Sequence, residues 1–215
     1  MTSSSRKIGA TLDAPASICT VTMADFSGGL PHLFGREAPR EMEIGCGKGR
    51  FIVRSAQTMP ERDFLAVELA SRYYRVGRDR ADRRGLTNLK MLCGDALFLI
   101  RHVLGDASLR AVHVLFPDPW PKKRHNKRRM FRPEFMNAVL RVLEDGGELN
   151  AASDHADYWQ AILPEVAAYP LLEKRPEFAL DARLPPGEVG HTNYEVKYRN
   201  SGRPIYQATW RRRPR

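Results

Sequence analysis

One acidic residue in this sequence is enclosed by prolines. Asp118 lies between two of them and precedes Trp120 and a third proline, directly after the apolar run 112–116. Each proline fixes its own φ and favours extended geometry in the residue before it, so we expect a stiff backbone that aims the side chains of Asp118 and Trp120. A carboxylate held in this way can accept hydrogen bonds from the N–H groups of a ligand and orient it. Asp118 is therefore the predicted catalytic residue.

A dense cationic segment follows the proline-rich turn. Seven of the eleven residues in 122–132 are Lys or Arg. Such a cluster is either a solvated loop or a binding surface for a polyanion, and its position directly after the run that carries Asp118 favours the second interpretation. Trp120 either stacks on a nucleic-acid base or anchors the loop. The candidates for RNA contacts are Arg124, His125, Asn126, Lys127, Arg128 and Arg129.

Composition agrees with one domain that binds nucleic acid. The 215 residues are 42% apolar and 28% charged, which is enough for one α/β core and leaves little room for a second large domain. The formal net charge of +10 favours a nucleic-acid partner, although a scattered excess of arginine also occurs in proteins that are merely soluble.

The cysteines and the lengths of the apolar segments indicate the cellular compartment of the protein. Cys19, Cys46 and Cys93 are widely spaced, with no CxxC pair and no accompanying zinc-type histidine spacing, which predicts a reducing compartment and no metal site. No apolar stretch has the length of a signal peptide or of a membrane span. The sequence predicts a cytoplasmic protein without a membrane partner, either a monomer or a homodimer.

Short apolar runs alternate with helical patterns from residue 40 onward. This order is typical of a parallel sheet with helices on both faces. The predicted strands are 41–46, 64–68, 89–94, 111–116 and 148–152. The predicted helices start near Phe51, cover 72–83, follow Asp95, open at Pro133 and cover 158–168, where Pro164 is expected to kink or split the last helix.

The two ends of the chain carry weaker signals. Residues 1–38 are rich in Ser, Thr, Gly and Pro, which predicts a flexible or loosely packed arm before a single domain at 39–215. Near the other end, 194–198 and 204–210 resemble strands, so we expect an antiparallel pair at one side of the sheet. The prediction is an α/β fold with a seven-stranded, mostly parallel sheet.

A glycine-rich turn, 45–49, joins the first predicted strand to its helix. Its glycines allow a ligand to approach backbone N–H groups closely. An arginine stands where dinucleotide-binding sequences have their last glycine, and the sequence has no GxxxxGK[ST] run for a nucleoside triphosphate. Glu68 ends the next strand, where a carboxylate can bind both hydroxyls of a ribose. The alternative is that Glu68 is only a solvated residue at the end of a strand. The cofactor-binding candidates here are Glu43, Gly45, Gly47 and Glu68.

This pairing of a glycine turn with an acid resembles Rossmann-like class I methyltransferases, which bind S-adenosylmethionine. The resemblance implies that Asp95, after the third strand, lies near the adenine of the cofactor. It implies that Glu43 lies near the methionine end of the cofactor. It also implies that Asp118 contacts the cofactor. The cofactor predicted from this resemblance is S-adenosylmethionine.

The run 116–129 closely resembles the signature of the tRNA (guanine-N7) methyltransferases. The likeness extends over about 41–211 and includes the motifs Glu43 to Gly49, Ser153-Asp154 and Thr192 to Glu195. It implies methylation of a guanine in the variable loop of tRNA. The substrate-binding positions that it implies are Lys122, Asp154, Thr192, Asn193, Tyr194 and Glu195, with 124–129 as the RNA strip. The sequence departs from many relatives at Pro121 and Pro164.

The residues fit this chemistry on independent grounds. Guanine N7 carries a lone pair and no proton at neutral pH, so it can attack an electrophilic methyl group directly. No deprotonating base is then required, and the sequence shows no convincing Ser-His-Asp, Cys-His or metal constellation. Catalysis would arise mainly from positioning, with Asp118 orienting the ring.

Two other functions stay open at this point. Amino-group methyltransferases that act on adenine N6 also place an acid or amide beside prolines and an aromatic residue after the fourth strand, but without a cationic strip behind it. A non-catalytic RNA-binding subunit could retain the same fold, although the intact acids Glu43, Glu68, Asp95 and Asp118 argue against it.

Overall fold

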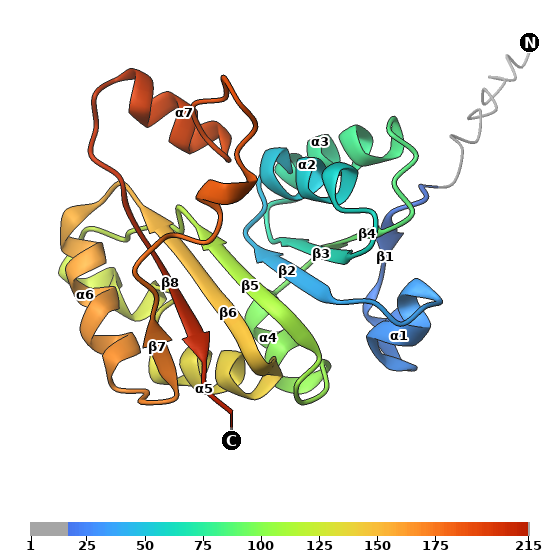
Figure 1. The fold of residues 1–215 in the computed structure, drawn as a ribbon, viewed down its shortest axis with the longest axis horizontal. Coiled ribbons are helices and arrows are strands. Elements are labelled where there is room, and N and C mark those ends of the chain that lie inside the picture. Colours follow the sequence, from blue (N-terminus) through green and yellow to red (C-terminus); the bar gives the residue numbers. More distant parts are fainter. Residues whose placement is uncertain (1–16, 215) are drawn as a thin grey trace, which may run out of the picture.

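The computed structural model of the chain describes residues 17–214. In this part eight strands form one sheet, in the order β1-β4-β3-β2-β5-β6-β8-β7 (Figure 1). Strands β1 to β6 run parallel to one another, whereas β8 is antiparallel to β6 and β7. The strands are β1 Thr20–Val21, β2 Arg40–Ile44, β3 Asp63–Glu68, β4 Leu89–Cys93, β5 Leu109–Leu115, β6 Leu143–Ser153, β7 Leu172–Lys174 and β8 Tyr206–Arg212.

Helices connect the strands and cover both faces of the sheet. The α-helices are α1 Gly29–Phe34, α2 Arg50–Thr58, α3 Ser71–Asp82, α4 Ala96–His102, α5 Pro133–Val142, α6 Ala156–Ala167 and α7 Asn193–Asn200. Three short 3-10 helices are η1 Met23–Phe26, η2 Lys123–Arg128 and η3 Asp181–Arg183. The predicted α/β fold with a mostly parallel sheet is confirmed. The sheet in the described residues has eight strands rather than the predicted seven, because the short strand β1 adds to it by pairing with β4.

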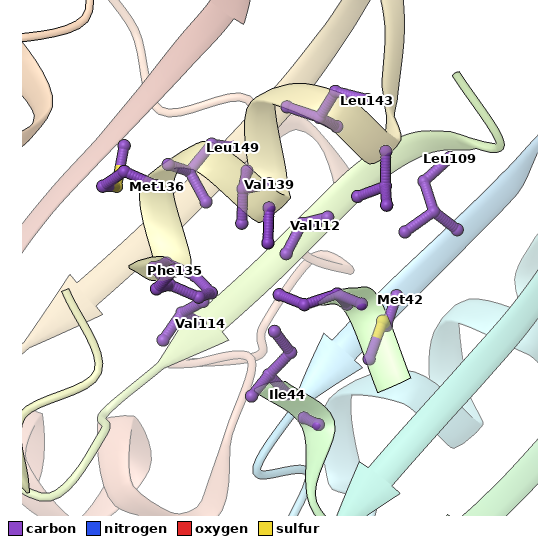
Figure 2. Close-up of a cluster of buried hydrophobic side chains, with 14 of the residues drawn as sticks. Met42, Ile44, Leu109, Val112, Val114, Phe135, Met136, Val139, Leu143 and Leu149 are labelled. Carbon is purple, nitrogen blue, oxygen red and sulfur yellow. The ribbon is translucent and has the colours of Figure 1, made fainter. Parts of the chain in front are cut away.

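The larger core lies between the sheet and α4, α5 and α6. Phe135, Met136 and Val139 of α5 are fully buried and belong to the same cluster as Val112 and Val114 of β5 (Figure 2). Their spacing of three and four places the α5 side chains on one stripe of the helix. Burial of each such side chain contributes about 1.5–3 kcal/mol. A second core, beneath α2 and α3, covers the other face, so a central strand such as β3 is buried along its whole length.

The antiparallel end of the sheet differs from the prediction in one strand. The run 194–198 was expected to be a strand because Tyr194, Val196 and Tyr198 alternate with polar residues, but it lies within helix α7. The Thr192 hydroxyl accepts a hydrogen bond from the Glu195 N–H at 3.0 Å and caps this helix. This T-x-x-E pattern is a helix-start signal that outweighs the alternation. The partner of β8 is instead the three-residue strand β7.

The described part of the predicted arm is packed rather than loose. Strand β1 pairs with β4, and Val21, Phe26 and Leu30 are buried in the larger core. Burial of these three apolar side chains fixes a segment whose composition alone suggested mobility. The prediction of a loose arm is wrong for residues 17–38, and for residues 1–16, which lie outside the described part, it stays a prediction.

Helix α6 runs through Pro164 without a break, so Pro164 does not split it. Proline removes the hydrogen bond to the carbonyl four residues earlier, which here belongs to Gln160. Gln160 is exposed, so water can satisfy that carbonyl.

Candidate functional site

Two adjoining cavities open where β2, β3, β4 and β5 end. The smaller has a volume of ≈ 200 Å³ and reaches Glu43, whereas the larger has a volume of ≈ 360 Å³ and is lined by Glu68, Asp95 and Asp118. The residues that line both are Gly45, Gly47, Tyr73, Leu115 and Tyr194. The structure thus brings the predicted acids of four different strands to one edge of the sheet, as expected for parallel strands whose carboxyl ends meet there.

The glycine turn supplies the floor of both cavities. Gly45 and Gly47 have φ of 72° and 55°, a left-handed conformation that favours glycine, and no atom lies within 4 Å of where a Cβ would be. A ligand therefore meets bare backbone at these two positions. Gly49 has a different role, because a Cβ there would lie 3.3 Å from the Cα of Gly77. That glycine pair allows the start of α2 to approach α3 closely.

Backbone N–H groups fix the position of Glu68. One of its carboxylate oxygens accepts a hydrogen bond from Gly47 N at 2.8 Å, and the other accepts one from Ala70 N at 2.8 Å. Each oxygen retains a further lone pair, so the carboxylate can still receive the two hydroxyls of a ribose.

Asp95 is held in a similar way at the start of α4. Its Oδ1 accepts hydrogen bonds from Leu97 N at 2.8 Å and Phe98 N at 3.2 Å, the geometry of an N-cap. The side chain lines the larger cavity, where its second oxygen can accept a hydrogen bond from a ligand.

Glu43 is buried without a partner for one of its oxygens. Glu43 is only 3% exposed, and its buried Oε2 has no hydrogen-bond partner among the described residues. Burial raises the pKa of Glu43 to about 8, and the neighbouring charge of Glu68 raises it further, while a backbone hydrogen bond from Ile52 opposes the shift. A cationic donor from a ligand in the smaller cavity would satisfy Oε2 and restore the ionised carboxylate.

Together these features fit S-adenosylmethionine. Bare glycine backbone, a fixed carboxylate for the ribose and a capped acid beyond it suit an adenosine, and the orphaned Oε2 of Glu43 suits an amino group. Glu68 and Asp95 line the larger cavity, whereas Glu43 lines the smaller one, so the two ends of such a ligand would lie in different cavities.

The turn that carries Asp118 is held in an unusual backbone conformation. Phe116 and Trp120, each of which precedes a proline, have φ of 56° and 45°. Extended geometry had been expected at these positions, so that prediction is wrong, and the strain of a left-handed conformation in bulky residues is stored at the site. The turn is anchored by Arg129, whose Nε donates to Pro119 O at 2.8 Å and whose guanidinium lies 4.9 Å from the ring of Tyr158.

Asp118 itself is exposed and lines the larger cavity. Beside it the Phe116 ring lies 6.4 Å from Tyr194 and 5.8 Å from Tyr198, and the two tyrosine rings are stacked at 6.1 Å. The strand end that delivers Asp118 is thereby packed against α7. Tyr194 is 47% exposed and presents an aromatic face to both cavities.

The basic segment, residues 122–132, begins as the 3-10 helix η2 next to the larger cavity. Lys123, Arg124 and Lys127 are exposed, and none of the three forms a salt bridge among the described residues. Arg128 lines the larger cavity and stacks on Trp120 at 4.9 Å, so Trp120 acts as a loop anchor. Arg129 contributes through its anchoring contacts. The candidate strip therefore divides into cations without an acidic partner among the described residues, called the free cations below, and cations that hold the turn.

The remaining predicted substrate positions lie at different distances from the cavities. Thr192, Asn193 and Tyr194 line the smaller cavity, whereas Lys122 is exposed and lines neither. Glu195 is buried. Its carboxylate accepts a hydrogen bond from His191 N, just before α7, at 2.8 Å and forms an ion pair with Arg199 at 2.7 Å. The other two predicted RNA contacts, His125 and Asn126, lie within η2.

Asp154 is placed at the end of β6 and faces α7. It forms an ion pair of 2.5 Å with Arg203, whose guanidinium lies 4.8 Å from the ring of Tyr198. Asp154 lines neither cavity but is joined to them through the stacked tyrosines.

Sequence reasoning missed Tyr73, Lys197 and Arg203. Tyr73 lines both cavities and Lys197 lines the smaller one. The position of Tyr73, five residues after Glu68 and inside the first turn of α3, was a usable signal because that turn starts at the ligand-binding edge. Arg203 could not be found from sequence, since its pairing with Asp154 joins residues 49 positions apart.

Within residues 17–214 no group of three or more His, Cys, Asp or Glu side chains is arranged to hold a metal ion. No helix in this part of the chain combines the length and the apolar character needed to cross a membrane.

Comparison with solved structures shows the same fold in methyltransferases. An antibiotic-related methyltransferase superposes with a TM-score of 0.60 at 12% identity, covering 92% of this chain and 98% of that one. The 16S rRNA (adenine(1408)-N(1))-methyltransferase of Catenulisporales acidiphilia gives 0.56 at 13% identity, covering 90% and 92%.

Comparison with known sequences is more specific. The model of a family described as putative methyltransferases matches residues 37–208. The tRNA (guanine-N(7)-)-methyltransferase of Alkalilimnicola ehrlichii is 37% identical over 86% of this chain and 77% of its own length, and that of Halorhodospira halophila is 38% identical over 86% and 80%. These names do not favour an adenine-N6 enzyme or a non-catalytic subunit. The chain belongs to this methyltransferase family, among the tRNA (guanine-N(7)-)-methyltransferases.

Proposed function

We propose that the chain transfers the methyl group of S-adenosylmethionine to N7 of a guanine in the variable loop of tRNA. The observation that carries the proposal is the junction of the two cavities. The cofactor-type cradle around Gly45 and Gly47 opens directly onto the space beside Asp118 and Tyr194, and the basic segment borders that space. A base and a methyl donor can therefore meet while the nucleic-acid backbone lies on cations.

The chain's own residues would hold the cofactor as follows. Glu68 would accept hydrogen bonds from the ribose hydroxyls, Asp95 would face the adenine, and Glu43 would receive the amino group of the methionine end. When bound, S-adenosylmethionine supplies an electrophilic methyl group. Because the three acids project from three different strands, they define the orientation of the donor along the sheet edge.

Asp118 would orient the target base rather than remove a proton. Guanine N7 carries a lone pair and needs no base. The carboxylate can accept hydrogen bonds from the N1–H and amino group of guanine, groups that lie on the ring edge opposite N7. Asp118 also places negative charge where positive charge passes from donor to base, which stabilises the transition state. His125 lies in η2 beside Trp120 and is not needed for the reaction.

The exposed face of Tyr194 suits stacking on the base. Its partner Phe116 is held by the strained turn, so the aromatic wall and Asp118 are positioned by the same segment. The free cations of the basic segment would contact phosphates, each contact adding to the salt dependence of binding.

The proposal includes a cytoplasmic location, where tRNA is found. The prediction that the protein is a monomer or a homodimer stays a prediction.

The test is transfer from labelled S-adenosylmethionine to bulk tRNA, followed by identification of the modified nucleoside. Wild-type protein should yield N7-methylguanosine, and Asp118→Asn should reduce turnover about 100-fold. The dissociation constant for S-adenosylmethionine should change less than about threefold, because Asp118 acts mainly on the base.

Asp157→Asn is the matched control, since Asp157 is an exposed acid in the first turn of α6. It should leave turnover unchanged. Label on adenine N6 would establish the rival activity, and cofactor binding with no transfer to any RNA would establish a non-catalytic subunit. The orienting role would be contradicted if Asp118→Asn lost cofactor binding but kept the wild-type turnover per bound cofactor.

A further inference from the structure

Helix α3 has one buried face and one strongly basic face. Tyr74, Gly77 and Ala81 are buried against the sheet. Arg72, Arg75 and Arg83 are exposed, and at 100° per residue they lie on the side opposite the buried three. The α3 arginine surface is defined here as Arg72, Arg75, Arg80, Arg83 and Arg84.

This surface lacks acidic partners. The acids of α3 are engaged elsewhere, since Asp79 pairs with Arg78 at 2.6 Å and Asp82 accepts the N–H groups of Ile18 at 3.0 Å and Cys19 at 3.3 Å. Among the described residues, none of the five arginines of the surface forms a salt bridge, although Arg84 donates to Gln57 and to a backbone carbonyl.

The cations of this surface also repel one another. Burial lowers the pKa of Arg80, and the nearby charges of Arg84, Arg50 and Arg83 lower it further. Like charges gathered without a counter-charge destabilise a fold unless a polyanion neutralises them.

The α3 arginine surface begins at the rim of the cavities. Ala70 and Tyr73 line the larger cavity, and Arg72 donates to the Tyr73 hydroxyl at 2.6 Å. From there the helix leads away, so Arg83 lies roughly 16 Å from Arg72 along the axis at 1.5 Å per residue.

The topology places this surface and the basic segment on opposite sides of the glycine turn. Strand β2 lies between β3 and β5 in the sheet. Helix α3 follows β3 and the basic segment follows β5, so the two cationic regions leave the sheet edge on either side of the turn that ends β2 (Figure 1). A nucleic-acid strand whose base enters the cavities would extend across both regions.

We infer that the α3 arginine surface is a second phosphate-binding surface for the tRNA, on the side of the target nucleotide opposite the basic segment. The inference rests on the proposed function. The surface contacts sugar-phosphate backbone and carries no base specificity, because guanidinium groups along α3 and at its C-terminal end lie at a distance from the target base, where they can pair with phosphates. Two separate anchors fix the direction in which the strand crosses the site.

The test compares two double charge reversals that change net charge equally. Arg75→Glu with Arg83→Glu alters the α3 arginine surface and spares Arg72, which contacts the cavity tyrosine. Arg101→Glu with Lys174→Glu is the control, because both residues are exposed on α4 and β7 and neither forms a salt bridge among the described residues. Binding of tRNA is measured from 50 to 300 mM salt, and cofactor binding is measured in parallel.

For the α3 variant we expect about tenfold weaker tRNA binding at low salt. The slope of log affinity against log salt should become less steep by about 1.4 to 1.8, the loss of two phosphate contacts. The Michaelis constant for tRNA should rise while turnover at saturating tRNA and cofactor affinity stay unchanged.

The control variant should retain the wild-type slope. Equal weakening by both variants would show a net-charge effect and overturn the inference, as would an α3 variant with the wild-type slope. A failure of the proposed function would look different, since wild-type protein itself would then produce no N7-methylguanosine.

Discussion

Two glutamates on one strand show how burial can serve structure or function. Glu41 and Glu43 lie two residues apart on β2, on the same face, and both are buried. Glu41 is surrounded by groups of its own chain, whereas Glu43 lines the smaller cavity and its buried Oε2 has no hydrogen-bond partner among the described residues.

The partners of Glu41 form a closed cluster. Its carboxylate accepts hydrogen bonds from Arg62 at 2.5 Å, from Arg183 at 2.6 and 3.1 Å and from His113 Nε2 at 2.9 Å. His113 Nδ1 accepts from Asn150 at 3.3 Å, so the imidazole is a neutral Nε2–H tautomer. Burial alone would raise the pKa of Glu41, but the bonds to His113 and Arg183 outweigh it and lower the pKa. Burial lowers the pKa of His113.

The difference lies in where the compensating charge comes from. A buried carboxylate with partners inside the chain ties distant segments together, here β2, β5 and the segment of η3. A buried carboxylate without a cationic partner costs stability until a ligand supplies one. The same residue type on the same strand is therefore structural at one position and available for binding two residues later.

The largest expected effect is on stability at the closed cluster. Glu41→Gln removes the charge that compensates Arg62 and Arg183, and loss of one partner from a buried ion pair costs about 3 kcal/mol or more. Urea unfolding should show this decrease in the free energy of unfolding at pH 7. The decrease should shrink below pH 4.5, because a lowered pKa stabilises only above the unfolded value and is lost in acid. An unchanged stability at pH 7 would remove the contrast between the two glutamates.

The next effect is on cofactor affinity. Glu43→Gln should weaken S-adenosylmethionine binding by about 2 kcal/mol, roughly 30-fold, because a charged hydrogen bond to the amino group is lost. Calorimetric titration measures this affinity. The free energy of unfolding without ligand should not fall, which distinguishes Glu43→Gln from Glu41→Gln. A variant with wild-type affinity would show that Glu43 is only a buried strand end.

A smaller effect follows from the raised pKa of Glu43. Its folded pKa of about 8 exceeds the unfolded value near 4.5, so between these pH values the folded chain retains a proton that the unfolded chain has lost. The stability contributed by Glu43 therefore decreases as pH rises through this window. The unfolding free energy of Glu43→Gln relative to wild type should increase by at least about 1 kcal/mol from pH 5 to pH 8. A constant difference would contradict the raised pKa.

The smallest effect concerns an exposed ion pair. Arg203 is 52% exposed where it pairs with Asp154, so Arg203→Ala should lower the free energy of unfolding by less than about 1 kcal/mol. The measurement is urea unfolding beside Glu41→Gln. If Arg203→Ala lowered the free energy of unfolding as much as Glu41→Gln does, burial would not determine how much these ion pairs contribute to stability.

Much of the site was predictable because it depends on local order along the chain. The alternation of strands and helices places the residue after each parallel strand at one edge, so Glu68, Asp95 and Asp118 could be expected together. The roles within the basic segment could not, because the anchoring of Arg129 on Tyr158 joins distant parts of the chain. Helix α7 was within reach of sequence, since Thr192 and Glu195 carry a capping signal that the aromatic alternation obscured.

The sequence by itself determined the parallel α/β arrangement, the glycine turn and the acids that follow the strands, since periodicity and special backbone residues act over a few positions. Only the tertiary structure decided that Glu41 is neutralised internally and Glu43 is not, that Phe116 and Trp120 take left-handed conformations, and that the α3 arginine surface has no acidic partner among the described residues. Those properties depend on which charges and rings meet across the fold, and contacts between distant segments leave no local pattern.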